Sequence, residues 1–281
     1  MIYCYNDLLG YGKRLCEAIN TNKGSAMMIS HAAQVPNEHE SIVYVNFDGS
    51  DSVNRIYNEL LEYENVYIIP EKSITSISNN AVMQHEEINK WIPSSWLINN
   101  LRDAVGTIQR VAFPVVKYNS NGSKEIIESS EDAFKICAKA FDTKSAEKYL
   151  YLRSAVDSRD NEWFVFMLGK KYAFAAKVHE DKYQMINVMN EQYNELLKYA
   201  YTFMKDEDIS YAAVKVICGA DKNKGVISPF IDNVYASFPM DWLMTGGLVF
   251  ESDNGTDWKS TGKPALRIFD FAAKMIIEGI L

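Results

Sequence analysis

The N-terminal part of the chain alternates short apolar runs with stretches in which apolar residues recur at helical spacing. We expect strands at residues 2–6, 26–30, 41–47 and 65–70, and helices at residues 8–20 and 53–63. Strands separated by helices favour a mostly parallel sheet, and such sheets bind ligands at the carboxyl ends of their strands. The pattern therefore predicts a small α/β layer.

Two glycines follow the first expected strand. Gly10 and Gly12 match the start of a glycine-rich dinucleotide turn, but Leu15 stands where the third glycine belongs. Alone, this pattern is weak evidence for a bound cofactor.

A polar segment at residues 71–97 follows this layer, and Pro93 ends its expected helix. We place a domain boundary in this segment. Residues 1–85 are then an α/β domain, and residues 86–281 form a second domain.

The segment VAFPVVKYNSNGSK, at residues 111–124, joins an apolar strand, a lysine and a loop of Gly, Ser and Asn. Lys117 and Gly122 supply what a nucleotide phosphate needs, a fixed ammonium and a loop able to turn its N–H groups inward. A solvated hairpin with a surface lysine explains the same residues. The segment alone leaves both interpretations open.

After this loop we expect a strand at residues 125–129 and then a helix at residues 129–141. Ser129 and Asp132 form the start of a capping box, and the apolar side chains of the helix fall on one face. We expect a compact α+β unit at about residues 108–156, small enough to move as a lid.

The remaining sequence predicts α+β structure with antiparallel strands. The hairpin is expected around the turn Gly169-Lys170, between two apolar runs. Further strands are expected at residues 149–157, 209–218 and 225–238, and helices at residues 190–204 and 266–280.

The composition argues against a nucleic-acid or membrane partner. The net charge is -8 and the pI is about 5.2, whereas nucleic-acid binding needs a concentrated basic patch. The N-terminus lacks the basic region of a signal peptide, and no apolar run is long enough to span a bilayer. We expect a soluble, cytoplasmic protein.

Cysteine and histidine spacing gives no support for a zinc site or a redox dithiol. The four cysteines include no CxxC pair, and the four histidines show no HxH or HExxH spacing. We interpret the cysteines as core residues.

Four ordered motifs resemble the ATP-grasp superfamily, in particular carboxylate-amine ligases such as the ribosomal-protein glutamate ligases. The lid strand of that family has the form FPvvvK, before a Gly/Ser loop and a helix beginning "s.eda"; here the residues are FPVVK, NSNGSK and SSEDAF. The segments YLYLRSAV, RDNEWFVFMLGKKYAFAAKV and LRIFDFAAKMI resemble the hinge strand, the next hairpin and the closing helix. The resemblance covers most of the chain. It implies an α/β N-terminal domain followed by an α+β ATP-grasp-like domain with a mobile lid subdomain.

The resemblance also implies which residues bind ATP. Lys117 would contact the α- and β-phosphates, Gly122 and Ser123 would lie in the lid loop, and the adenine slot would be lined by Leu152, Arg153 and Ser154. Lys177, in the place of the family's last arginine, would meet the transferred phosphate or the substrate carboxylate. Such ligases phosphorylate a carboxylate and let an amine displace phosphate from the acylphosphate, largely by positioning and charge stabilisation.

The family's magnesium ligands are missing from their usual places. Lys215 stands where a strand acid belongs, and Ser228 and Phe230 replace a Glu and an Asn. Lys215 would supply part of the missing metal charge as a catalytic residue, or else it faces water on an edge strand. Asp232 and Asn233, just downstream, are either displaced Mg²⁺ ligands or part of a surface turn.

The segment at residues 230–242 lies where such ligases shape their acceptor pocket, so Asp232, Tyr235 and Asp241 are expected substrate contacts. The substrates would be a carboxylate and an amine, on small molecules or peptides. Their identity and the oligomeric state do not follow from the sequence. Three interpretations stay open: an ATP-dependent ligase, an ATP-grasp-shaped nucleotide-binding or regulatory protein without turnover, and an unrelated α+β protein.

Overall fold

The structure, a computed structural model, describes residues 1–37, 39–119, 123–142, 149–158, 162–179, 182–184, 192–236 and 247–279. The chain divides into two compact units. The first contains Met1–Ser78, Trp163–Lys215 and Val234–Leu281, and the second contains Asn79–Glu162 and Val216–Asn233. Strands of the described residues form three sheets. The predicted mixture of helices and strands is therefore confirmed.

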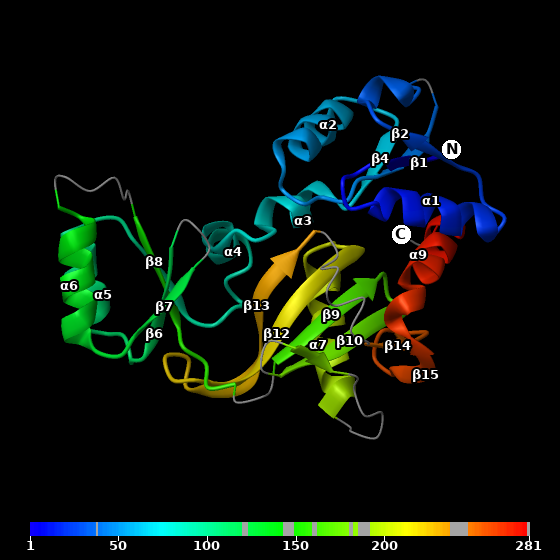
Figure 1. Ribbon diagram of the computed structural model, residues 1–281. Coiled ribbons are helices and arrows are strands. Elements are labelled where there is room, and N and C mark those ends of the chain that lie inside the picture. Colours follow the sequence, from blue (N-terminus) through cyan, green and yellow to red (C-terminus); the bar gives the residue numbers. More distant parts are fainter. Residues whose placement is uncertain are drawn as a thin grey trace. The chain divides into compact units, whose positions relative to one another are not determined.

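The first unit begins with a parallel sheet of four strands in the order β2-β1-β3-β4 (Figure 1). Its strands are β1 (Ile2–Tyr5), β2 (Ala26–Ile29), β3 (Ser41–Tyr44) and β4 (Val66–Ile69). The helical segments are α1 (Tyr11–Thr21), η1 (Ala32–Gln34), α2 (Asp51–Leu61) and α3 (Lys72–Ile77). The predicted parallel α/β layer is confirmed.

The loop between β1 and α1 holds the two glycines of the dinucleotide-like pattern. The buried Asp7 carboxylate accepts hydrogen bonds from the backbone N–H groups of Leu9 at 3.0 Å, Tyr11 at 3.1 Å and Gly12 at 2.7 Å. N–H groups at a helix N-terminus are the groups that would bind a phosphate. Here the Asp7 carboxylate already accepts hydrogen bonds from these N–H groups. We therefore interpret Gly10 and Gly12 as residues that permit the turn and not as part of a phosphate site.

The rest of the first unit is built on a seven-stranded sheet, whose order is β13-β12-β9-β10-β14-β15 with β11 on β10. Its strands are β9 (Glu162–Leu168), β10 (Tyr172–His179), β11 (Lys182–Gln184), β12 (Tyr211–Asp221), β13 (Val226–Tyr235), β14 (Leu248–Glu251) and β15 (Lys259–Pro264). The chain passes from one unit to the other within β12 and β13. Helical segments are α7 (Gln192–Asp206), η2 (Ala265–Arg267) and α9 (Ile268–Ile277). Helix α9 packs beside α1, where the rings of Tyr11 and Phe269 are 6.0 Å apart.

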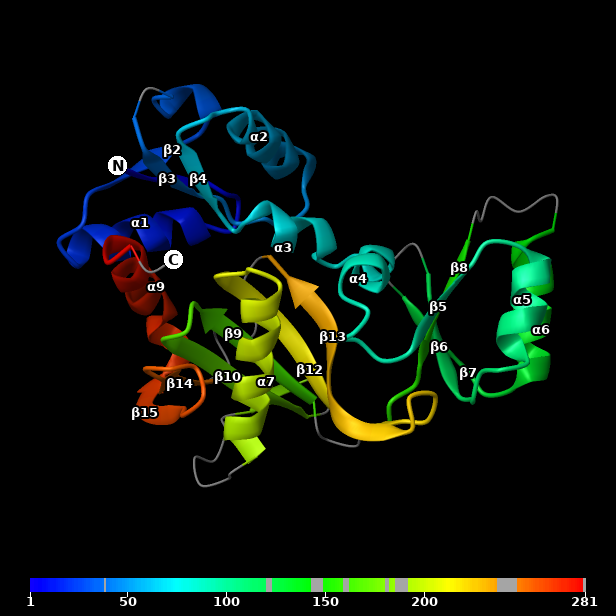
Figure 2. The same cartoon turned by 180° about the vertical axis from the view of Figure 1, so that it is seen from behind.

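The second unit contains an antiparallel sheet of four strands in the order β5-β8-β6-β7. Its strands are β5 (Ser95–Ile98), β6 (Val115–Tyr118), β7 (Lys124–Ile127) and β8 (Leu150–Ser154), and its helices are α4 (Ala81–Glu87), α5 (Leu101–Ile108) and α6 (Ser130–Ala140). Helices α5 and α6 lie side by side along one face of this sheet (Figure 2). Helix α6 begins as predicted, because the Ser129 hydroxyl accepts the Asp132 N–H at 3.2 Å. The described part of residues 108–156, where a lid is expected, lies within this unit, and the lid itself stays a prediction.

No described helix has the length and apolar character needed to cross a membrane.

We predict that Gly12→Ala lowers the free energy of unfolding by about 2 kcal/mol or more. A Cβ at this position would lie 1.8 Å from the carbonyl oxygen of Tyr5, so the backbone would have to move. Gly106→Ala in α5 is the matched control, since its Cβ would meet nothing within 4 Å. In that control the free energy of unfolding should rise by roughly 0.5–1 kcal/mol, because Ala has the higher helix propensity. Urea denaturation measures both, and equal effects would contradict the packing argument.

Candidate functional site

The two faces of the sheet in the second unit differ in chemistry. Val115 on β6, and Leu150 and Leu152 on β8, are buried in the apolar core formed with α5 and α6. Because successive strand residues point to opposite faces, Tyr151 and Arg153 point away from these helices. The face opposite the helices therefore carries a buried cation.

Arg153 is 2% exposed and bonds to three different segments. Its Nε donates to Tyr151 Oη at 3.1 Å, its Nη1 to the carbonyl oxygen of Asp232 at 2.7 Å, and its Nη2 to Gln84 Oε1 at 3.4 Å. The guanidinium also lies 4.9 Å from the ring centroid of Tyr118. Each of the three guanidinium nitrogens therefore donates a hydrogen bond, which offsets part of the cost of burying the charge.

The Asp232 carboxylate is the counter-ion of this arrangement. Its Oδ1 lies 3.7 Å from Arg153 Nη1 and accepts from Tyr118 Oη at 3.4 Å, and its Oδ2 lies 3.3 Å from Lys124 Nζ. We call this group the Arg153 cluster; it comprises Gln84, Tyr118, Lys124, Tyr151, Arg153 and Asp232. Two cations share one carboxylate, which gives the cluster a surplus of positive charge.

The pKa values of Arg153 and Tyr118 in this cluster are both shifted upward. Burial opposes the charge on Arg153, but Tyr118, Tyr151 and Asp232 outweigh it and raise the pKa of the guanidinium above its ordinary value. Burial, followed by the nearby charge of Asp232, raises the pKa of the Tyr118 phenol. Tyr118 therefore remains a hydrogen-bond donor, and Arg153 remains charged.

Lys117 lies on the other face of the sheet. In the strand register it pairs with Leu152 of the apolar core, and Tyr118 pairs with Tyr151 of the Arg153 cluster. Burial raises the pKa of the Cys137 thiol on α6, and the positive charge of Lys117 partly offsets this rise. The structure thus places Lys117 toward α6 and not with the Arg153 cluster. Its predicted contact with phosphate stays a prediction.

The residues expected in the lid loop and in the adenine slot do not all lie in one place. Gly122 lies outside the described residues, and exposed Ser123 accepts from Asn119 Nδ2 at 2.9 Å through its hydroxyl. Leu152 is in the helix-side core, and the Ser154 hydroxyl accepts from Asn223 Nδ2 at 3.0 Å. Of the three slot residues, only Arg153 reaches the cluster. Their nucleotide roles stay predictions.

The two expected metal ligands bond to different groups. Asn233 accepts from Gln84 Nε2 at 2.8 Å and donates to Asn79 Oδ1 at 3.0 Å, whereas Asp232 bonds to cations. The described residues contain no group of three or more His, Cys, Asp or Glu side chains able to hold a metal ion. A carboxylate already paired with two cations is a poor Mg²⁺ ligand, so these residues do not fit that ion as they stand.

The other predicted site residues belong to the first unit or are not described. Lys177 Nζ lies 5.6 Å from the ring centroid of Trp163, and the ring of Tyr235 lies 5.2 Å from that of Phe164. Lys215 is half-buried in β12. Asp241 lies outside the described residues. The predicted roles of these four residues stay predictions.

Sequence reasoning missed Gln84, Tyr118, Lys124 and Tyr151. The alternation in YLYLRS contained a signal for Tyr151 and Arg153, because it places both opposite the leucines. The Lys124 contact depends on the pairing of Lys124 with Tyr118 across β6 and β7, which the sequence does not specify.

We predict that Arg153→Met lowers the free energy of unfolding by about 3–5 kcal/mol, since it leaves the Asp232 carboxylate buried without its guanidinium partner. Lys124→Met is the matched control. Its side chain is 44% exposed, so its loss should cost at most about 1 kcal/mol. Urea denaturation followed by tryptophan fluorescence measures both. A cost for Arg153→Met no larger than that of the control would contradict the described network.

Comparisons with solved structures identify the fold. The macrocyclase MdnC from Microcystis aeruginosa, solved with its precursor peptide MdnA, is 12% identical and superposes with a TM-score of 0.61 over 99% of this chain and 98% of its own. An ATP-grasp ligase from Chryseobacterium gregarium, solved with ADP and a leader and core peptide, gives 11% identity and a TM-score of 0.58, covering 100% of this chain and 96% of that chain. A RimK-domain ATP-grasp protein from Sphaerobacter thermophilus is 13% identical and superposes with a TM-score of 0.56. The match covers 83% of this chain and 89% of that chain.

No protein-family model matches the sequence. No curated protein matches it either. The chain nevertheless has the ATP-grasp fold, which confirms the resemblance predicted from FPVVK and its neighbouring motifs at the level of fold.

Proposed function

We propose that this chain, which has the ATP-grasp fold, is an ATP-dependent ligase that joins a carboxylate to an amine. The observation that carries the proposal is the Arg153 cluster, a positively charged group on the sheet face opposite helices α5 and α6. A polyphosphate needs compensating positive charge wherever it binds. The similar ligases share the fold along nearly the whole chain.

The proposed reaction has two steps. An oxygen of the substrate carboxylate attacks the γ-phosphorus of ATP, and ADP leaves. The amine nitrogen then attacks the acyl carbon of the acylphosphate, and inorganic phosphate leaves with the former carboxylate oxygen. The protein contributes orientation and charge to both steps.

Lys124 is our proposed phosphate contact in the Arg153 cluster. Its ion pair with Asp232 is partly exposed, so little free energy is lost if an entering phosphate takes the place of the carboxylate. Lys117 faces the helices instead. The geometry therefore favours Lys124 over Lys117, while Arg153 keeps its bond to the Asp232 carbonyl oxygen.

The remaining roles keep their original assignment as proposals. Lys177 would meet the transferred phosphate or the substrate carboxylate, and Lys215 would supply charge that a metal supplies in related ligases. Asp232, Tyr235 and Asp241 would contact substrate. Because the described residues do not fit Mg²⁺ at Asp232 and Asn233, no step is assigned to a protein-bound metal.

A peptide is the proposed substrate class. Two of the similar ligases were solved with peptides, one with a precursor peptide and one with a leader and core peptide. We infer that a peptide supplies the carboxylate, the amine or both.

A second candidate function is nucleotide binding without turnover. It is favoured by the pairing of Asp232 with two cations and by the lack of a metal-ligand group among the described residues. In that case the cluster would serve only to bind phosphate.

We predict that ATP and MgCl₂ support ADP release that depends on both a carboxylate peptide and an amine. A coupled ADP assay over a panel of acidic peptides, with mass spectrometry for the new amide, measures this. Omission of the amine is the control. Saturable ATP binding in calorimetry without ADP release for any pair would favour the second candidate and contradict the ligase.

We predict that Lys124→Ala weakens ATP binding by about tenfold or more, since one charge-assisted contact is worth roughly 1.5–3 kcal/mol. Lys117→Ala, on the opposite face of the same hairpin, should change the affinity less than about threefold. Calorimetric titration with a non-hydrolysable ATP analogue measures both. If Lys117→Ala lost more ATP affinity than Lys124→Ala, Lys117 would be the phosphate contact, as first expected from the sequence. The argument from strand faces would then be wrong.

A further inference from the structure

A pocket of about 530 Å³ lies in the second unit beside the Arg153 cluster, since the ring of His85 in its lining is 5.8 Å from the ring of Tyr151 in the cluster. Its lining shares no residue with that cluster and comes from α4 and the segment after it, β5 and the segment before it, the end of α5 and the turn between β12 and β13. The lining residues are His85, Asn89, Lys90, Ser94, Ser95, Trp96, Arg110, Asn223 and Lys224. The volume falls within the range of small-molecule sites.

Every titratable residue that lines this pocket is basic. These are His85, Lys90, Arg110 and Lys224, and no carboxylate lines the pocket among the residues that the structure describes. In a chain of net charge -8, a pocket lined by basic groups alone is a local reversal of charge. Such a reversal attracts anions.

One carboxylate close to Lys224, that of Asp221, holds the backbone that frames the pocket. Asp221 accepts from the backbone N–H groups of Ser94 at 2.7 Å, Asn223 at 2.9 Å and Lys224 at 3.3 Å. Asn223 is fixed in turn, since its side chain accepts from Ala112 N at 2.6 Å and donates to Ala112 O at 2.9 Å. The turn that carries Lys224 is therefore held in place before any ligand arrives.

Lys224 has capacity for an anion. Its Nζ donates to the carbonyl oxygen of Ile92 at 2.7 Å, and an ammonium has three donors. The residue is exposed overall, but desolvation of the ammonium lowers its pKa, against the opposing pull of Asp221. It forms no ion pair within the described part of the chain. An oxyanion could form the direct ion pair that Asp221 does not form with this ammonium.

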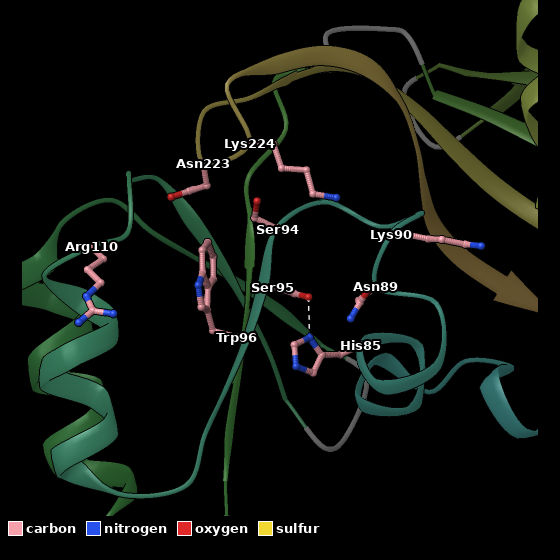
Figure 3. A pocket seen from close by; sticks show the side chains of 9 residues that line it. All are labelled: His85, Asn89, Lys90, Ser94, Ser95, Trp96, Arg110, Asn223 and Lys224. Carbon is pink, nitrogen blue, oxygen red and sulfur yellow. Dashed lines mark hydrogen bonds between the residues drawn. The ribbon is translucent and has the colours of Figure 1, made fainter.

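Trp96 gives the pocket a flat apolar wall. In the view of Figure 3 its indole ring lies between the Arg110 side chain and the side formed by His85, Asn89 and Ser95. His85 is oriented by a hydrogen bond of 2.7 Å between its Nδ1 and Ser95 Oγ. An indole face favours contact with another planar or apolar group.

We propose that this pocket binds an organic oxyanion, a phosphate ester or a carboxylate, whose planar part lies against Trp96 and whose charge meets Lys224. This site is additional to the proposed phosphate contact at Lys124. It would let a small anionic ligand bind to the second unit whether or not the ligase proposal holds.

The test follows the indole N–H signal of Trp96 by NMR, assigned with Trp96→Phe, while phenyl phosphate, benzoate, inorganic phosphate or benzyl alcohol is added. We expect a saturable shift with phenyl phosphate or benzoate, a weaker one with inorganic phosphate and none with benzyl alcohol. A response to one aromatic anion only identifies the phosphate or the carboxylate as the preferred group.

Lys224→Ala should weaken that binding by about tenfold or more, and Lys224→Arg should restore most of it. Lys222→Ala, in the same turn but outside the lining, is the matched control and should bind as the unchanged protein does. Lys124→Ala should also leave it unchanged, which separates this site from ATP binding. The proposal is overturned if no anion shifts the Trp96 indole signal. It is also overturned if Lys222→Ala and Lys224→Ala lose the same amount of affinity for the aromatic anion. Unfolding of Lys224→Ala is detected by circular dichroism, and Arg110→Ala then serves as the second variant.

Discussion

The second unit depends on a positive charge held inside it. Moving a guanidinium out of water costs several kcal/mol unless its donors and its charge are satisfied. Arg153 meets this requirement through Tyr151 on its own strand, Gln84 on α4 and Asp232 on β13. The charge therefore fixes the position of three segments of this unit relative to one another. A neutral residue at 153 would leave Asp232 without this partner.

Strand alternation decides which side chains can take part. On β8 the leucines enter the core with α5 and α6, while Tyr151 and Arg153 point to the opposite face. Strand β6 obeys the same rule. The family form FPvvvK has three residues between proline and lysine, and FPVVK has two. A shift of one residue exchanges the two faces of a strand. In β6 the register pairs Tyr118 with Tyr151 and Lys117 with Leu152, so Tyr118 joins the cluster and Lys117 does not.

The sequence predicted those features that hydrophobic spacing and local capping determine. The parallel layer of β1 to β4 and the capped helix α6 are features of this type. The ATP-grasp fold is expected instead from the resemblance of the ordered motifs to that superfamily. The Arg153 cluster, in contrast, depends on contacts between residues far apart in the sequence. Asp232 is 79 positions from Arg153 and Gln84 is 69, and both contacts need the tertiary fold. No local pattern encodes such a pairing, and single-residue alignment with a family cannot detect a change of strand face.

The cluster separates a fixed cation from an exchangeable one. Arg153 is bound through the backbone carbonyl of Asp232, so a rotation of the Asp232 side chain leaves that bond intact. Lys124 is bound through the side-chain carboxylate, with its Nζ 4.9 Å from the ring centroid of Tyr118, and its side chain is 44% exposed. The Asp232 end of this pair is buried, but the lysine end is partly exposed, so we expect the pair to be worth about 1 kcal/mol at most and an incoming anion to replace the carboxylate at little cost. Asp232 would then be released from one of its two cations, and this release is what both candidate functions require first. They differ only afterwards: a ligase needs a second compensating charge at the transferred phosphate, whereas a binding protein does not.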